Sequence, residues 1–215
     1  MVSFEIPLIL SLLGIVMLTG TLDLVEIIES QVNFPWIIFM PIGAIVFFIC
    51  ILAELERIPF DLPEAESEIV AGWLTEFSGM MYGLVQLGTY IKLYAFAALF
   101  VVMFLGGWNG PWVFPIEPIA EVITDGIVIM PGALTVELAG LPLFSQEMIN
   151  GTIWFVLKTV AVIFFILLPR GVFPRVRIDL LLKIGWYKLI VLAFVNIFIA
   201  LALVYSGVIG PGGIM

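Results

Sequence analysis

Five long runs of apolar residues, separated by polar or charged segments, set the pattern of this chain. They occupy residues 6–22, 36–53, 77–107, 152–168 and 184–205. The first holds 17 residues and no charge, which at about 1.5 Å per helical residue nearly crosses hydrocarbon about 30 Å thick. The pattern predicts an all-α, polytopic transmembrane helix bundle with five spanning helices, forming a single integral membrane domain over residues 1–215.

The segments between these runs differ in charge, and the difference predicts their orientation. Residues 54–76 are acidic but include Arg57, residues 169–183 are basic, and residues 108–150 contain no lysine or arginine. Because positively charged loops stay on the inner side, we expect the acidic and basic loops to be cytoplasmic and residues 108–150 to form an outer loop. The N-terminus is then cytoplasmic and the C-terminus outside, in a cell membrane or another energy-transducing membrane.

The start of the chain does not resemble a targeting segment. It lacks the basic region, the short apolar core and the small-residue cleavage site of a signal peptide. We therefore expect residues 6–22 to be a retained helix.

The composition excludes most chemistry that the chain could perform alone. Hydrophobic residues make up 63% of the sequence, the mean hydropathy is +1.24, and there is no histidine. With Cys50 as its single cysteine, the chain supplies no ligand set for an iron–sulfur cluster, a bis-histidine haem or an ordinary zinc site. The formal charge of −9 argues against nucleic acid as a partner. Any redox reaction that the chain serves must use centres in other subunits.

The acidic loop contains seven of the seventeen acidic residues, beside two spanning segments. They are Glu54, Glu56, Asp61, Glu64, Glu66, Glu68 and Glu76. Carboxylates in such places usually face a protein interior or a water-filled path, so these seven are candidates for a proton or coupling path. We rank Glu68 and Glu76 first for proton transfer, because they lie further toward the membrane. The alternative is a solvated surface that only docks basic residues of a partner.

A helix start is expected inside this loop. Asp61 can accept backbone N–H groups, Pro63 is tolerated in a first turn, and Glu64 can return the capping contact. Glu64 and Glu68 then share one helix face and repel each other, which favours exchange of a proton between them.

Lys92 lies near the middle of the apolar residues 77–107. An ammonium group at that depth is costly unless it is paired or hydrated. We expect Lys92 to face a carboxylate or a water path and to belong to the coupling path. The alternative is an interfacial position, if the helix starts later than residue 77.

Several motifs carry a resemblance to a known family. They are Ala53-Glu54, Arg57, Pro59-Phe-Asp-Leu-Pro-Glu-Ala-Glu66, Glu68, Ala71-Gly72, Thr75-Glu-Phe-Ser-Gly79 and Arg170-Gly-Val-Phe-Pro-Arg-Val-Arg-Ile-Asp179. This set resembles the membrane subunit at the foot of respiratory complex I. The same family includes the equivalent subunit of energy-converting membrane-bound nickel–iron hydrogenases and of related ferredoxin-dependent complexes.

The resemblance implies a place in a multisubunit complex. It implies that the region from Asp61 to Glu76 meets a soluble electron-transfer arm and that the glutamates line a polar path into the membrane arm. The implied partners are soluble hydrogenase-like and iron–sulfur subunits and antiporter-like membrane subunits. Iron–sulfur clusters, and in one branch a nickel–iron centre, would lie in those partners, with a quinone as a further possible ligand. The residues expected to dock the soluble arm are Arg57, Arg170, Arg175, Arg177 and Lys183.

Two departures from the family pattern shape the functional hypothesis. Members usually have eight spanning helices, and the five here match the last five, as expected of a fragment, a split subunit or a numbering that starts at an internal methionine. Quinone-reducing members usually carry Thr-Asn before the arginine and an acid before the tyrosine of the next helix, where this chain has Leu55-Glu56 and Gly88-Thr89-Tyr90.

These departures favour the hydrogenase branch. We expect a membrane-anchor and coupling subunit, not catalytic alone, that links electron transfer in a soluble iron–sulfur arm to proton or sodium translocation. One alternative is a quinone-chamber subunit of an NADH or ferredoxin dehydrogenase. Another, of a different class, is a passive docking scaffold.

Overall fold

The computed structural model describes most of the membrane part of the chain. The described residues are 2–32, 34–57, 59–60, 79–110, 122–124, 127–129, 136–138, 141–144, 146–172, 176 and 178–206. In chain order the helices are α1 (Val2–Thr19), α2 (Leu24–Glu29), α3 (Pro41–Glu54), α5 (Met80–Phe104), α6 (Gln146–Leu167), α7 (Pro169–Val172), α8 (Ile178–Lys183), the π-helical segment η2 (Ile184–Leu189) and α9 (Ile190–Tyr205).

The predicted fold class is confirmed. Among the described residues, three helices are long and apolar enough to cross a membrane, namely Met80–Phe104, Asn150–Leu167 and Asp179–Tyr205. Two shorter apolar helices, Ser3–Thr19 and Pro41–Glu54, accompany them. Helix α3 begins at Pro41 rather than near residue 36, because proline fixes a backbone angle suited to the first turn but lacks the N–H that a helix interior needs.

The last spanning helix begins earlier than the hydrophobic pattern predicts. Helix α8, segment η2 and helix α9 follow one another without a break from Ile178 to Tyr205. The predicted start near residue 184 is therefore wrong, and the basic loop is shorter than residues 169–183. Asp179 in the first turn and Lys183 in the last turn of α8 suit the helix dipole, so polar residues begin this helix before its apolar run.

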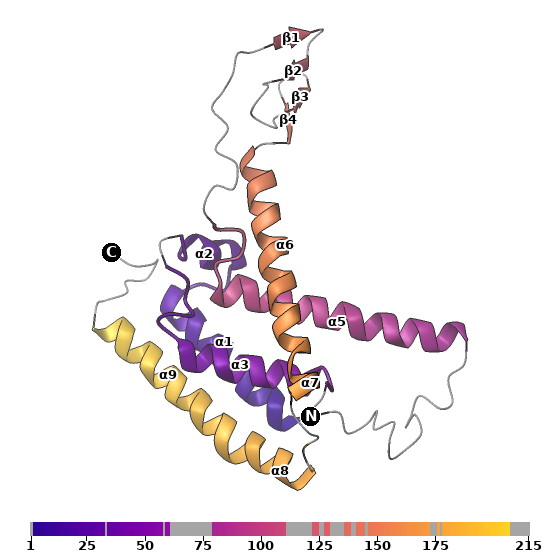
Figure 1. Ribbon diagram of the computed structural model, residues 1–215. Coiled ribbons are helices and arrows are strands. Elements are labelled where there is room, and N and C mark those ends of the chain that lie inside the picture. The colour runs from indigo at the N-terminus through magenta and orange to yellow at the C-terminus, as the bar shows by residue number, and fades with distance from the viewer. Residues whose placement is uncertain are drawn as a thin grey trace.

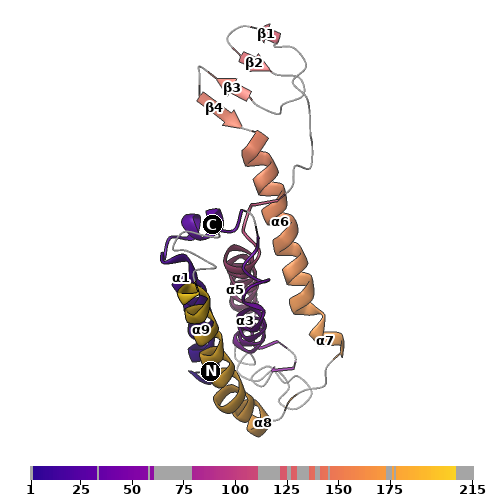
Figure 2. The same ribbon diagram turned by 90° about the vertical axis from the view of Figure 1, so that its left-hand side faces the viewer.

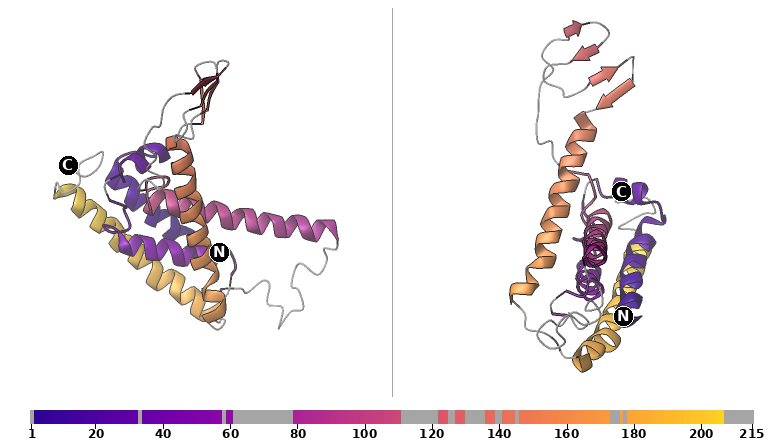
Figure 3. Two further views of the ribbon diagram at one scale, coloured as in Figure 1. Left: turned by 45° about the horizontal axis from the view of Figure 1, so that its top comes forward. Right: turned by 90° about the vertical axis from the view of Figure 1, so that its right-hand side faces the viewer.

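The helices form three layers. Figure 2 shows α1 and α9 side by side, then α3 and α5, and then α6 on the far side, and the right-hand view of Figure 3 gives the same order. Fully buried Phe47 and Cys50 of α3 and Phe104 of α5 belong to the core at the centre of these layers. The N-terminal half of α5, with exposed Met80 and Leu84, extends beyond the other helices (Figure 1). That half is left for lipid, for the acidic loop or for other subunits.

A buried asparagine marks the closest packing in the bundle. Asn196 of α9 is fully buried, and its Nδ2 donates to the Ser11 carbonyl at 3.5 Å. A Cβ atom added at Gly43 or at Gly14 would come within 2.6 Å of this amide. The two glycines therefore give α1 and α3 the space to meet Asn196, a combination of small and polar residues common between membrane helices.

A small antiparallel sheet lies within the predicted outer loop. It consists of β1 (Val122–Thr124), β2 (Ile127–Ile129), β3 (Val136–Leu138) and β4 (Leu141–Phe144), paired in that order. Short runs rich in β-branched residues suit such strands, although the apolar character of this loop led us to expect only a membrane-hugging loop. Figure 1 shows the sheet beyond the end of α6, away from the bundle.

Candidate coupling site

The structure describes two of the seven candidate acids, Glu54 and Glu56, together with Arg57 and Lys92. Lys183 is described at the end of α8, and the backbone of Arg170 lies in α7. The other predicted site residues lie outside the described residues: Asp61, Glu64, Glu66, Glu68, Glu76, Arg175 and Arg177. The acidic and basic loops meet at one end of the bundle, where the Val176 amide donates to the Pro59 carbonyl at 3.1 Å. They therefore share one side of the membrane, as their charges predict.

Lys92 and Glu54 form an ion pair between two helices. Lys92 Nζ lies 2.8 Å from Glu54 Oε1 and also 2.8 Å from the backbone carbonyl oxygen of Glu54. Glu54 is the last residue of α3, and Lys92 lies near the middle of α5. The expectation that Lys92 faces a carboxylate is confirmed. The ammonium group also accepts the role of a helix cap, since a cation near the C-terminus of α3 favours the helix dipole.

The Glu54 carboxylate is only half satisfied. Its side chain is 17% exposed, against 42% for Lys92. The second oxygen, Oε2, is buried and has no hydrogen-bond partner among the described residues. Leaving a buried acceptor unpaired costs about 1–3 kcal/mol, and more for a charged group. Oε2 is therefore the atom of this site best placed to receive a proton, a water molecule or a donor from another segment.

Glu56 follows α3 in a backbone conformation that favours glycine. Its φ is +51°, and the next amide, of Arg57, bonds back to the Leu52 carbonyl at 3.3 Å. This is a helix end of the kind that usually carries glycine at the left-handed position. A side chain there costs about 1 kcal/mol relative to glycine. A carboxylate kept at a strained position is consistent with a role outside folding.

Arg57 stacks on α5 one helical turn from the ion pair. Its guanidinium carbon lies 5.4 Å from the centre of the Tyr90 ring. We expected Arg57 to be the main counter-charge of the nearby acids, but for Glu54 that partner is Lys92. Sequence reasoning did not single out Tyr90 as a contact residue. An aromatic residue two positions before a mid-helix lysine was the available signal.

Helix α5 carries further polar side chains before this point. Gln86 Nε2 lies 3.3 Å from the Tyr82 hydroxyl, and the Thr89 hydroxyl donates to the Gln86 carbonyl at 2.7 Å. At 100° per residue, Tyr82, Gln86 and Thr89 share a face with Leu93 and Ala97, which are buried. The face that packs on the bundle in the second half of α5 thus becomes polar in the first half. Sequence reasoning missed these residues as a group.

The described residues contain no group of three histidine, cysteine, aspartate or glutamate side chains that could hold a metal ion. The single cysteine, Cys50, is buried in α3. The chemistry that the described site offers is therefore charge pairing and proton exchange at carboxylates.

Comparisons with known proteins cover nearly the whole chain. A sequence family described as NADH dehydrogenase matches residues 1–201. The NADH-quinone oxidoreductase subunits H of Bacillus cytotoxicus and of a Geobacillus species are each 41% identical to it over 199 residues. Those alignments cover 93% of this chain and 50% of each relative. The chain thus spans about half the length of the curated relatives it matches.

One solved structure supports the fold. A chain of the membrane-bound sulfane sulfur reductase, an archaeal respiratory membrane complex, superimposes with a TM-score of 0.68. The match covers 93% of this chain and 56% of that one, at 23% sequence identity. At this identity the likeness establishes a shared helical architecture and no shared reaction.

Proposed function

Because this chain belongs to the NADH dehydrogenase family, we propose that it is the membrane-anchor and coupling subunit of a multisubunit NADH-quinone oxidoreductase-type complex. The resemblance drawn from the acidic-loop motifs is confirmed by the family match over residues 1–201. The observation that carries the proposal is the 41% identity to two subunits H over 93% of the chain.

The quinone branch is better supported than the hydrogenase branch. Leu55-Glu56 and Gly88-Thr89-Tyr90 favoured the hydrogenase branch from local sequence. The named relatives are instead quinone oxidoreductase subunits, and the solved structure is too distant in sequence to indicate an acceptor. Two local departures weigh less than similarity along nearly the whole chain. The iron–sulfur clusters and the electron input would lie in soluble partner subunits.

The ion pair gives the coupling role a physical basis. Glu54 carries a buried oxygen without a hydrogen-bond partner among the described residues, at the membrane end of the acidic loop. A proton arriving at Oε2 would neutralise the carboxylate and weaken its attraction to Lys92, since the ion pair depends on the ionised form. The charge state of Glu54 would thus alter the contact between α3 and α5. Asp61, Glu64, Glu66, Glu68 and Glu76 would extend the same path.

The basic residues would serve the other side of this interface. Arg57, Arg170, Arg175, Arg177 and Lys183 would dock the soluble arm, at the end of the bundle where the two loops meet. That end would be cytoplasmic, with the N-terminus inside and the C-terminus outside.

Purification of the native complex through a tag on this chain tests the proposed function. Mild detergent should recover soluble iron–sulfur subunits that reduce a quinone analogue, with iron and without nickel. Nickel together with hydrogen production would replace the quinone branch by the hydrogenase branch. Recovery of the chain without any redox subunit would refute the proposed function.

A separate comparison distinguishes a coupling subunit from a passive scaffold. Glu54→Gln should leave the complex assembled and quinone reduction measurable but lower ion translocation per quinone reduced. A scaffold whose acids only dock a partner would instead lose assembly, and the complexes that remained would couple normally.

A further inference from the structure

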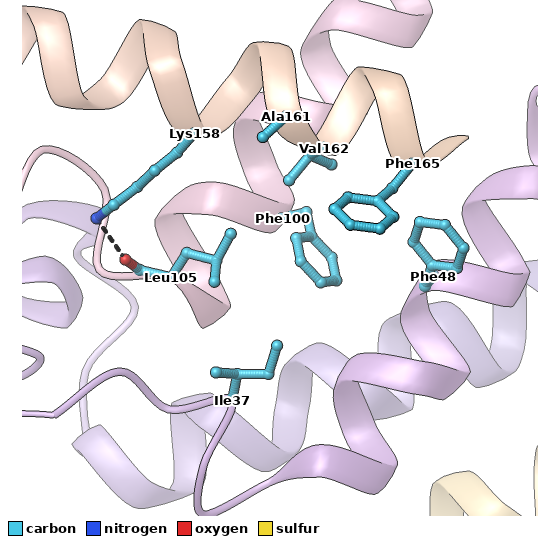
Figure 4. A pocket seen from close by; sticks show the side chains of 8 residues that line it. All are labelled: Ile37, Phe48, Phe100, Leu105, Lys158, Ala161, Val162 and Phe165. Atoms are coloured by element: carbon cyan, nitrogen blue, oxygen red, sulfur yellow. Dashed lines mark hydrogen bonds between the residues drawn. The ribbon is translucent and has the colours of Figure 1, made fainter. Parts of the chain in front are cut away.

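A cavity of about 310 Å³ lies between α3, α5 and α6, nearer the C-terminal end of α5 than the Glu54–Lys92 pair. Its walls are apolar, and Figure 4 shows the rings of Phe48, Phe100 and Phe165 turned toward one another across it. Ile37 and Val162 complete this wall. A space of this size without polar partners is a poor site for water, since ordered water needs two to four hydrogen bonds.

The one charged residue at the cavity offers it no free hydrogen-bond donor. Lys158 borders the cavity with its carbon chain, and Figure 4 shows its nitrogen pointing away toward Leu105. Nζ donates to the carbonyls of Leu105 at 2.7 Å and Gly107 at 3.1 Å, and to that of Asn109. An ammonium group has three donors, and these three carbonyls occupy them. A polar headgroup would therefore find no partner here, whereas an apolar chain needs none.

The cavity is open on the exposed face of α6. Phe165, at its edge, is 59% exposed, and Val160 and Phe164 beside it are also exposed. This helix is one of the three long enough to cross a membrane, so its exposed apolar face meets hydrocarbon unless another subunit covers it. Acyl chains are the hydrocarbon of the bilayer, and they can enter such an opening from the side.

From this geometry we infer that the cavity binds one acyl chain of a membrane phospholipid. The chain would fill the space between the phenylalanine rings and join α6 to α3 and α5, while the headgroup stayed outside the cavity. A close-packed interior loses dispersion contacts wherever a void remains, which favours occupation. The site would be occupied in the same way whichever acceptor the complex reduces.

Photolabelling in a lipid disc tests this inference. The purified complex is placed in discs of phosphatidylcholine that includes a small share bearing a diazirine near the end of one acyl chain. After an excess of unlabelled lipid is added and the sample is illuminated, we expect labels on peptides containing Phe48 and Phe165. Ala161→Phe, which places a ring at the cavity, should reduce that labelling to the level of other lipid-facing peptides. Ala202→Phe, on the exposed face of α9, should leave it unchanged.

Three outcomes would overturn the inference. Labelling of the cavity peptides in Ala161→Phe equal to that of the unmodified chain would show that the lipid lies elsewhere. Labelling by a quinone with a diazirine in its tail, but not by the phospholipid, would assign the cavity to the quinone. Absence of lipid labels, with a cross-link to another subunit, would show that protein covers the opening. Ala161→Leu fills less space and serves as the variant if Ala161→Phe prevents assembly.

Discussion

Replacement of Lys92 by methionine isolates the contribution of the interhelical ion pair. The substitution keeps most of the side-chain volume and removes the ammonium group that contacts both Oε1 and the backbone carbonyl of Glu54. Glu54 would then hold a mostly buried carboxylate without its cation. The contact between the end of α3 and the middle of α5 should weaken as a result.

The structure sets the size of this effect. Exposed ion pairs contribute about 0–1 kcal/mol, whereas removal of one partner from a fully buried pair costs about 3–5 kcal/mol. With Glu54 at 17% and Lys92 at 42% exposure, the pair lies between these limits. We expect a loss of about 2 kcal/mol, equivalent to roughly 30-fold in an equilibrium constant.

A double-mutant cycle measures the pair directly. Lys92→Met, Glu54→Gln and the double variant are compared by thermal unfolding of the complex and by proton translocation per quinone reduced in proteoliposomes. The double variant removes both charges, so it should be more stable than Lys92→Met alone, and the two single effects should not add. Lys92→Arg, which keeps the charge, serves as the control and should retain most of the translocation. Strict additivity of the two single effects, with translocation unchanged in Lys92→Met, would refute the assigned role of the pair.

Three further predictions concern packing and helix ends, and each is checked by thermal unfolding of the assembled complex. Gly43→Ala brings a Cβ within 2.6 Å of the Asn196 amide and should destabilise by about 1–3 kcal/mol; Gly83→Ala, with no neighbour within 4 Å, should be neutral or stabilising, and equal losses would contradict the packing argument. Glu56→Gly relieves a positive φ and should stabilise by about 1 kcal/mol while lowering translocation; unchanged translocation would remove Glu56 from the coupling path. Lys158→Met leaves three carbonyls without their donor and should cost at least about 1–3 kcal/mol, whereas unchanged stability would show that water replaces the ammonium group.

The sequence predicted those features that depend on composition and on local pattern. Apolar run length identified the spanning helices, and the cost of an isolated ammonium group in hydrocarbon identified Lys92 as a residue that needs a carboxylate. The structure supplied which carboxylate, because the choice of Glu54 depends on how α5 crosses α3. That crossing is set by tertiary packing, which a single sequence without paired positions does not reveal.

Other features depend on contacts between distant segments and could not be predicted in this way. Asn196 looked like an ordinary polar residue in an apolar helix until Gly14 and Gly43 were seen to make room for it. The strands of the outer loop were hidden by its prolines and glycines, and Tyr90 gained its meaning only from the position of Arg57. The roles of Asp61, Glu64, Glu66, Glu68 and Glu76 stay predictions, since these residues lie outside the described part of the chain.

Ion translocation during quinone reduction tests the coupling claim most directly. The complex purified through this chain is reconstituted in sealed proteoliposomes, supplied with its electron donor and a quinone analogue, and followed with probes of internal pH and sodium. The account predicts a gradient that forms with quinone reduction, collapses on addition of the matching ionophore, and shrinks in Glu54→Gln while quinone reduction continues. Sustained quinone reduction in sealed vesicles without any proton or sodium gradient would contradict it.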